Sequence, residues 1–450
     1  MKTILKVIIH IFAGKNGYMI NTIKRKVQKI LSDPFWKSVA ILFSGSALAQ
    51  ALPILILPII TRIYPKEALG FYFVYVAITM LTQIVASLQF QLAIVLPKDK
   101  EDAYKLLNIN LILVFVISAT MLLGIWVFFD FIASFIEQRE MLFWLYAVPF
   151  STFFLGVFNA LSYFLNRERN YKILSMSKIS KSVTFSIFHI VFGILGFLKS
   201  GLILGLILGQ IVSMVYLIYF VIIKTDFKFR YKFSELKDVF LKYKDIPLFN
   251  TIISILNTLS NQLPLFLLAR FFGVRAAGDY GLANRMVTTP MGLISQSVGQ
   301  VFYQEAAAIQ NSGGSLESII KTTYKRLFKI GIVPFIILAA LAPWLFKIAF
   351  SVDYISSGEI TRYLIPWLFV MFLNSPLTYI ITVLNKQRQM IIYDSCLLGA
   401  RFLALYLGYS VFNNLFSAVF LFSAVGFIFN VFLLLYFWQI SKQPIVKVYD

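Results

Sequence analysis

A chain of 450 residues is long enough for two or three soluble domains, but its composition excludes that interpretation. Hydrophobic residues make up 59% of the chain, charged residues only 14%, and the mean hydropathy is +0.80. A soluble fold carries roughly a quarter charged residues. The composition therefore predicts a polytopic membrane protein. The formal charge of +21 is then typical of basic cytoplasmic loops rather than of a nucleic-acid partner, and the single Cys396 excludes an internal disulfide.

Twelve apolar stretches along the chain approach the roughly 20 residues that a bilayer core about 30 Å thick requires. They cover residues 36–60, 69–95, 106–129, 141–165, 173–198, 201–223, 247–272, 280–303, 327–350, 363–384, 391–412 and 415–438. The alternating pattern of a transmembrane β-barrel is absent from these stretches. The sequence therefore predicts an all-α integral membrane protein with about twelve transmembrane helices.

The charges predict the orientation. With the N-terminus in the cytoplasm, most Lys and Arg residues fall in cytoplasmic segments, as the positive-inside rule requires. We therefore expect both termini to be cytoplasmic. Residues 1–35 have the charges of a basic cytoplasmic segment and lack a cleavable signal pattern; either an interfacial amphipathic helix or a mobile basic tail fits them. Residues 439–450 would form a cytoplasmic C-terminal tail.

The segments that join the first and second helices of each half resemble one another. At a constant offset of 208 residues, Arg62 corresponds to Arg270 and Gly70 to Gly278. A second match, at an offset of 219, follows the fourth helix of each half. Because each half has six helices, both would insert with the same orientation and form a parallel repeat about an axis along the membrane normal.

This repeat predicts the domain organisation. Helices 1–6 would form an N-lobe at 36–223, a basic cytoplasmic loop at 224–246 would link the halves, and helices 7–12 would form a C-lobe at 247–438. Two such lobes facing one another enclose a central cavity that can open to either side. The architecture favours a transporter.

Ionisable residues inside a membrane cost several kcal/mol and usually face a wet cavity. The candidates are Lys178 and Lys181 in helix 5, Arg285 in helix 8 and Arg401 in helix 11. Since Arg and Lys bind phosphate, a cavity lined by these four residues suits an acidic or phosphate-bearing substrate. Other roles remain open: the lysines can extend to the interface, Arg285 can reach the outer surface, and Arg401 can have a structural hydrogen-bonding role.

Acidic residues are scarce at the same depth. Asp394 lies at the cytoplasmic start of helix 11 and Glu305 just beyond helix 8, and none is expected near the midplane. Exporters of cationic drugs use buried carboxylates, so their absence would favour an anionic substrate.

Two further sets of residues are candidates for gating or structure. Pro53 and Pro264 lie toward the outer ends of the first helices of the two halves, where each removes a backbone hydrogen bond and favours a bend. Such a bend can open an outer gate, or it can be a static kink that shapes packing. Arg62 and Arg270, at outer helix ends, would anchor to headgroups, and their repetition together with that of Gly70 and Gly278 adds a gating or folding role.

Motifs of soluble enzymes are missing. The chain has no phosphate-binding Gly-rich loop, no Gly-x-Ser-x-Gly nucleophile motif and only two histidines. We therefore expect neither an enzyme, nor a cofactor, nor a metal site.

The run from Gly45 to Gln50 with Pro53, followed by the run from Pro58 to Gly70, resembles the N-terminal signature of bacterial polysaccharide flippases of the Wzx type. These O-antigen translocases belong to the multidrug/oligosaccharidyl-lipid/polysaccharide (MOP) exporter superfamily. The loop Asn166-Arg167-Glu168-Arg169 resembles that family as well.

The resemblance implies a MATE-like, two-lobed flippase of the bacterial inner membrane that serves lipopolysaccharide or other surface-polysaccharide synthesis. It would move an undecaprenyl-pyrophosphate-linked oligosaccharide from the cytoplasmic to the periplasmic leaflet by alternating access, coupled to H⁺, Na⁺ or the membrane potential. Membrane lipids would surround it, and the polysaccharide polymerase and chain-length machinery are candidate partners. The alternatives are a MATE-like cation-coupled exporter of drugs or metabolites, a peptidoglycan-precursor flippase and a non-transporting scaffold.

Overall fold

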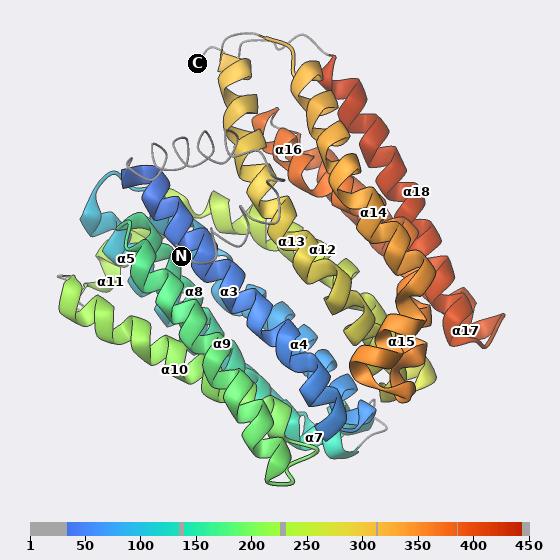
Figure 1. Cartoon of the computed structure of the whole chain (residues 1–450). Helices are drawn as coiled ribbons and strands as arrows, with labels where there is room; N and C mark the ends of the chain where they lie inside the picture. Colours follow the sequence, from blue (N-terminus) through green and yellow to red (C-terminus); the bar gives the residue numbers. More distant parts are fainter. Residues whose placement is uncertain (1–33, 135–138, 226–230, 312–313, 385, 443–450) are drawn as a thin grey trace, which may run out of the picture.

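The computed structural model describes residues 34–134, 139–225, 231–311, 314–384 and 386–442 (Figure 1). Of the expected tails, residues 1–33 and 443–450 lie outside these ranges, and residues 439–441 belong to the last helix. Within the described residues the chain is helical, with no strand. Six long helices form the N-lobe: α3 (Pro34–Ile63), α4 (Lys66–Ser87), α5 (Lys100–Val127), α8 (Ala147–Arg167), α9 (Tyr171–Ile194) and α10 (Gly201–Lys224). Six more form the C-lobe: α12 (Asp245–Phe272), α13 (Val274–Asn311), α14 (Glu317–Phe350), α15 (Ile355–Asn374), α17 (Gln387–Ser410) and α18 (Leu415–Ser441).

These helices confirm the all-α fold expected from the twelve apolar stretches. In the described ranges, ten helical regions are long and apolar enough to cross a membrane, which makes the chain a multi-pass membrane protein. The two long helices that do not meet this criterion are α9 and α13. Both are long enough to span but more polar than the others, and they carry three of the four predicted cavity cations.

Two predicted helix boundaries are wrong for a backbone reason. The expected helix 69–95 ends at Ser87, because Leu88 and Gln89 have φ values of 44° and 56° and break the α-helix before the 3₁₀ segment η1 (Phe90–Val95). The expected helix 363–384 ends at Asn374. There Pro376, which has no N–H to donate, falls at the start of η3 (Ser375–Thr378), and α16 (Tyr379–Val383) follows.

The expected inter-lobe loop contains a helix that the sequence analysis did not predict, α11 (Phe233–Tyr243). It packs on the N-lobe: Phe240 stacks on Phe90 with ring centroids 5.0 Å apart, and Lys242 forms an ion pair with Asp102 at 2.8 Å. Three more short elements, α6 (Phe129–Ser134), α7 (Arg139–Leu145) and η2 (Val352–Tyr354), lie between long helices.

Small residues determine how closely the long helices pack. A Cβ built on Gly45 of α3 would lie 2.5 Å from the Ser175 Cβ of α9, and Ser182 of α9 donates a hydrogen bond of 2.7 Å to the Ala49 carbonyl. Close packing of this kind through Gly and Ser is typical of membrane helices, where helix association depends on van der Waals contact and hydrogen bonds.

One apolar core runs through both lobes. It includes Ile60 and Leu69 on the N-lobe side and Leu268 and Ala277 on the C-lobe side, all nearly inaccessible. A second core lies within the N-lobe, among η1, α5, α8, α10 and α11. The lobes are therefore joined by shared packing near the α3–α4 and α12–α13 connections.

The α17–α18 contact offers a test of this packing. A Cβ built on Gly408 would lie 2.2 Å from the Ala418 Cα, whereas one built on Gly399 of the same helix meets nothing within 4 Å. We expect Gly408→Val to cost about 1–3 kcal/mol by overpacking and to lower the melting temperature of the purified protein by several degrees. Gly399→Ala should leave it unchanged or slightly higher, because Ala favours helix. Equal melting temperatures for the two variants would contradict the packing.

Candidate functional site

The lobes meet where α4 and α13 begin, in a contact that we call the junction: Lys66, Glu67 and Gly70 of α4 against Val274, Arg275, Gly278 and Asp279 of α13. A Cβ on Gly70 would lie 2.0 Å from the Val274 carbonyl oxygen, and one on Gly278 would lie 2.7 Å from the Lys66 carbonyl oxygen. Any larger side chain at either glycine would push the backbones apart. The two glycines that the repeat pairs in sequence therefore lie against one another in space.

Ion pairs flank these glycines. Glu67 accepts a hydrogen bond of 2.7 Å from the Arg275 Nε, and both side chains are largely exposed. The Lys66 amino group lies 2.9 Å from the Asp279 carboxylate, which is almost buried. Ser356 and Ser357 of α15 donate further hydrogen bonds of 2.8 and 2.6 Å to Asp279. The exposed pair contributes little stability, whereas Asp279 depends on its three partners because it is buried.

The junction lies on the repeat axis. Glu67 and Arg275 differ by the repeat offset of 208, as do Gly70 and Gly278, and Lys66 and Val274 begin their helices at that same offset. A residue that contacts its own repeat equivalent must lie close to the axis that relates the two halves. The axis therefore passes between α4 and α13 at this end of the bundle.

Tyr64, between α3 and α4, fixes the N-lobe side of the junction. Its hydroxyl donates a hydrogen bond of 2.7 Å to the His189 carbonyl, and a Cβ on Gly193 or Gly201 would touch its ring. Burial raises the pKa of Tyr64 to about 12, so the phenol stays protonated and can donate. The His189 ring in turn bonds to the Leu202 carbonyl at 2.8 Å, a packing role inside the N-lobe.

Two of the four predicted cavity cations lie together inside the N-lobe. The Lys178 amino group lies 3.1 Å from the Ser46 hydroxyl of α3, and the Lys181 amino group lies 5.1 Å from the centre of the Phe158 ring of α8. Both side chains are half-buried. Because α3, α8, α9 and α10 contain no Asp or Glu, neither lysine has a carboxylate partner on these helices.

Arg285 faces the same lobe from the other side. It lies on α13 and lines a small cavity with Pro53 of α3, Tyr72 of α4 and His189 of α9. Along α9, His189 is eight residues from Lys181, about 12 Å. Arg285 therefore approaches α9 near His189, whereas Lys178 and Lys181 lie further along the same helix, beside α3 and α8.

Arg401 lies apart from the other three cations. It is 2% exposed inside the C-lobe, with its guanidinium 4.6 Å from the centre of the Trp367 ring and 4.8 Å from that of Phe422. Its Nη1 donates to the Ser260 hydroxyl at 2.8 Å. A ligand could reach this group only after the helices of the C-lobe separate.

The structure also shows a buried carboxylate that the sequence analysis placed at a helix end. Asp394 is 6% exposed, and it lies seven residues, or two turns of α17, before Arg401. The C-lobe therefore holds an acid and a base inside a membrane-spanning helix.

The remaining candidates have simpler surroundings. Pro53 and Pro264 lie inside α3 and α12, as expected. Arg62 is exposed and donates to the Pro58 carbonyl of its own helix at 2.7 Å, and Arg270 is exposed at the end of α12. Among the described residues, no group of His, Cys, Asp or Glu could hold a metal ion.

The sequence analysis missed the ion pairs of the junction. Glu67, Arg275 and Asp279 lie within or beside the repeated segment, and their charges were visible there. The Glu67–Arg275 pair could have been predicted, because these two residues have opposite charges and occupy equivalent positions of the repeat. Residues near a twofold axis contact their own equivalents.

Comparisons with known proteins agree with this architecture. The model of a family described as "Polysaccharide biosynthesis protein" matches residues 59–359. No curated protein matches significantly.

Solved structures show the same fold. One similar structure is the lipid II flippase MurJ in an inward closed conformation, with a TM-score of 0.71 at 14% identity, covering 91% of this chain and 88% of that one. Another is an inward-facing MATE multidrug resistance transporter of the MOP superfamily, with a TM-score of 0.64 at 13% identity, covering 89% and 94%. An outward-facing MATE structure gives 0.62 at 15% identity, covering 90% and 96%.

The fold expected from the repeat is therefore confirmed, and the family match covers more than half of the chain. With its MATE-like and MurJ-like fold, this chain belongs to the polysaccharide biosynthesis protein family.

Proposed function

We propose that this protein is a flippase of the bacterial inner membrane that moves an undecaprenyl-pyrophosphate-linked oligosaccharide from the cytoplasmic to the periplasmic leaflet. The observation that carries the substrate class is the pair Lys178 and Lys181, two half-buried cations inside a set of helices without acids and with no carboxylate partner in the part of the chain that the structure describes. A buried cation without a counter-ion is costly unless a ligand supplies the negative charge. A pyrophosphate supplies it, with Arg285 approaching from α13.

Family membership supports the carbohydrate part of the proposal, and the fold supports transport between two lobes. In the proposed cycle the glycan and pyrophosphate pass between the lobes while the polyprenyl chain stays in lipid.

The junction is the periplasmic gate, with both termini cytoplasmic. Gly70 and Gly278 meet there through backbone alone, and the Glu67–Arg275 pair is exposed and weak, so opening the gate mainly requires the buried Lys66–Asp279 pair to part. The coupling ion, H⁺ or Na⁺, and a partnership with the polymerase and chain-length machinery belong to the same proposal.

The substrate site can be tested by removing its charge. We expect Lys178→Gln with Lys181→Gln to lower flipping at least tenfold, because each charge-assisted hydrogen bond contributes about 1.5–3 kcal/mol. The measurement is surface polysaccharide and leaflet-resolved lipid-linked oligosaccharide in cells that carry the variant as their only copy. Lys172→Gln, an exposed lysine at the start of the same helix, is the control and should retain activity. Full activity in the double variant would exclude the cationic site.

The role of the junction can be tested by cross-linking Glu67→Cys to Arg275→Cys in a Cys396→Ser background, with a short reagent that contains a reducible disulfide. If the junction must part, cross-linking stops flipping and reduction restores it. The control is Asp102→Cys with Lys242→Cys, an ion pair of similar length on the N-lobe alone, which should tolerate the same cross-link. Continued flipping with the junction cross-linked would contradict the gate.

Arg401 was expected to bind substrate, and its buried position suggests a different experiment. We expect Arg401→Leu to remove two cation–ring contacts and the Ser260 hydrogen bond and to cost roughly 2 kcal/mol. Thermal unfolding of the purified protein should show this loss, while Lys181→Gln unfolds like the parent. A stable Arg401→Leu variant that does not flip would instead restore Arg401 to the substrate site.

A second candidate function, a cation-coupled exporter of drugs or metabolites, is favoured by the buried Asp394. Exchange of a cationic drug for H⁺ or Na⁺ needs a carboxylate of this kind. Asp394→Asn separates the two functions. If the protein is such an exporter, the substitution sensitises cells to cationic drugs and leaves surface polysaccharide unchanged.

A further inference from the structure

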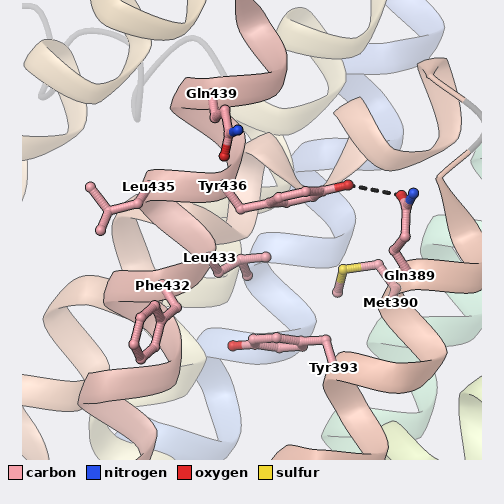
Figure 2. Close-up of a pocket in the computed structure, with 8 residues that line it drawn as sticks. All are labelled: Gln389, Met390, Tyr393, Phe432, Leu433, Leu435, Tyr436 and Gln439. Carbon is pink, nitrogen blue, oxygen red and sulfur yellow. Dashed lines mark hydrogen bonds between the residues drawn. The ribbon is translucent and has the colours of Figure 1, made fainter.

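A groove separates the first half of α17 from the last half of α18, and its cavity volume is about 370 Å³ (Figure 2). Met390, Tyr393 and Leu433 line it together with the exposed side chains of Phe432 and Leu435. The corresponding pair in the N-lobe, α9 and α10, is closely packed, with a Cβ on Gly205 or Gly209 meeting the opposite helix within 3 Å. Between α17 and α18 the same close packing is found at Gly408 and Ala418, outside the groove.

The groove is apolar along most of its length and polar at one end. Gln389, near the start of α17, and Gln439, in the last turn of α18, lie at this end, and the Tyr436 hydroxyl donates a hydrogen bond of 2.8 Å to the Gln389 Oε1 (Figure 2). Phe432 and Tyr393 lie at the other end. An occupant must therefore have an apolar chain with hydrogen-bonding groups at one end.

Positively charged residues lie at the helix ends next to the polar end of the groove. Lys386 caps the start of α17, four residues before Met390. Lys442 caps the end of α18, three residues after Gln439, with its amino group 5.3 Å from the centre of the Trp438 ring. Arg388, next to Gln389, is exposed. The first turn of α17 contains no acid, and Asp394 is buried within the lobe. The charge at this end therefore suits a phosphate.

One wall of the groove belongs to the outer side of the C-lobe. α17 packs against α12 and α18, and Figure 1 shows α18 on the side of the C-lobe remote from the N-lobe. A substrate that passes between the lobes would not need this position. A membrane lipid could occupy this position, because Ile392, Phe432 and Leu435 expose apolar surface beside the groove in a membrane-spanning part of the chain.

We propose that this groove binds one anionic glycerophospholipid of the surrounding bilayer. An acyl chain lies along Met390, Leu433 and Phe432. The glutamine side chains bond the ester region, and the phosphate lies against Lys386 and Lys442. This site is separate from the proposed substrate site and does not depend on the flippase function.

A second groove provides a control. It lies on the N-lobe among α5, α8 and α10, has a cavity volume of about 340 Å³, and is lined only by apolar side chains such as Ile112, Phe115 and Ile222. It can take acyl chains but offers no selection by headgroup. The two grooves therefore separate a specific site from ordinary contact with lipid.

The test is photo-crosslinking in nanodiscs of phosphatidylglycerol and phosphatidylcholine in equal amounts, with a benzophenone amino acid replacing Leu435 or, as control, Ile112. Mass spectrometry identifies the adducts. At Leu435 we expect phosphatidylglycerol to be enriched over the bulk lipid roughly tenfold, since two lysines contribute. At Ile112 the adducts should match the bulk ratio.

Lys386→Gln with Lys442→Gln should abolish the enrichment at Leu435. Lys321→Gln with Lys325→Gln, exposed lysines on α14, should leave it intact. An unselective ratio at Leu435 overturns the proposal. So does an adduct with another segment of this chain or with a second copy. Displacement of the adduct by undecaprenyl pyrophosphate but not by added phosphatidylglycerol also overturns it, because the groove would then hold the substrate's own tail.

Discussion

The backbone contact between Gly70 and Gly278 is the constraint on which the rest of the architecture depends. Each glycine lies so close to the first residue of the opposite helix that a single methyl group would collide with its carbonyl oxygen. α4 and α13 can begin side by side only because both positions lack a side chain. This contact places the repeat axis, brings Glu67 to Arg275 and Lys66 to Asp279, and joins the apolar cores of the two lobes.

The same contact determines where the charges can act. Close to the junction, positive and negative groups neutralise one another across the lobes. Further along α9 the cations continue without acids, since the surrounding helices α3, α8 and α10 contain none. One end of the inter-lobe surface is therefore closed by ion pairs that attract the lobes. In the proposed function the lysines of α9 receive their counter-charge from a ligand. That separation suits a carrier of an anionic headgroup.

Much of this fold could be predicted from the sequence, because twelve apolar stretches and a repeated Arg–Gly spacing are properties of the chain itself. The ends of α4 and α15 were less predictable. The left-handed Leu88 and Gln89 have no side-chain signature comparable to glycine, and Pro376 fits equally well inside a kinked helix or at the start of η3. Helix α11 was hidden because a short, charged amphipathic segment has the composition of a loop.

The site shows a different limit. At the repeat offset of 219 residues Lys181 corresponds to position 400, next to Arg401, and this alignment predicts similar depth in the membrane. Depth alone does not determine which way a side chain faces. Lys181 points toward Phe158 inside the N-lobe, whereas Arg401 is enclosed by Trp367, Phe422 and Ser260. Equivalent positions diverged because the C-lobe provides two aromatic rings and a serine that can solvate a guanidinium.

The measurement that tests the account most directly is the leaflet distribution of lipid-linked oligosaccharide in cells with and without this protein. If the protein is the flippase, its loss leaves the oligosaccharide on the cytoplasmic leaflet and lowers surface polysaccharide, and restoring the chain reverses both effects. An unchanged distribution, together with increased sensitivity to cationic drugs, would contradict the account and would favour the exporter.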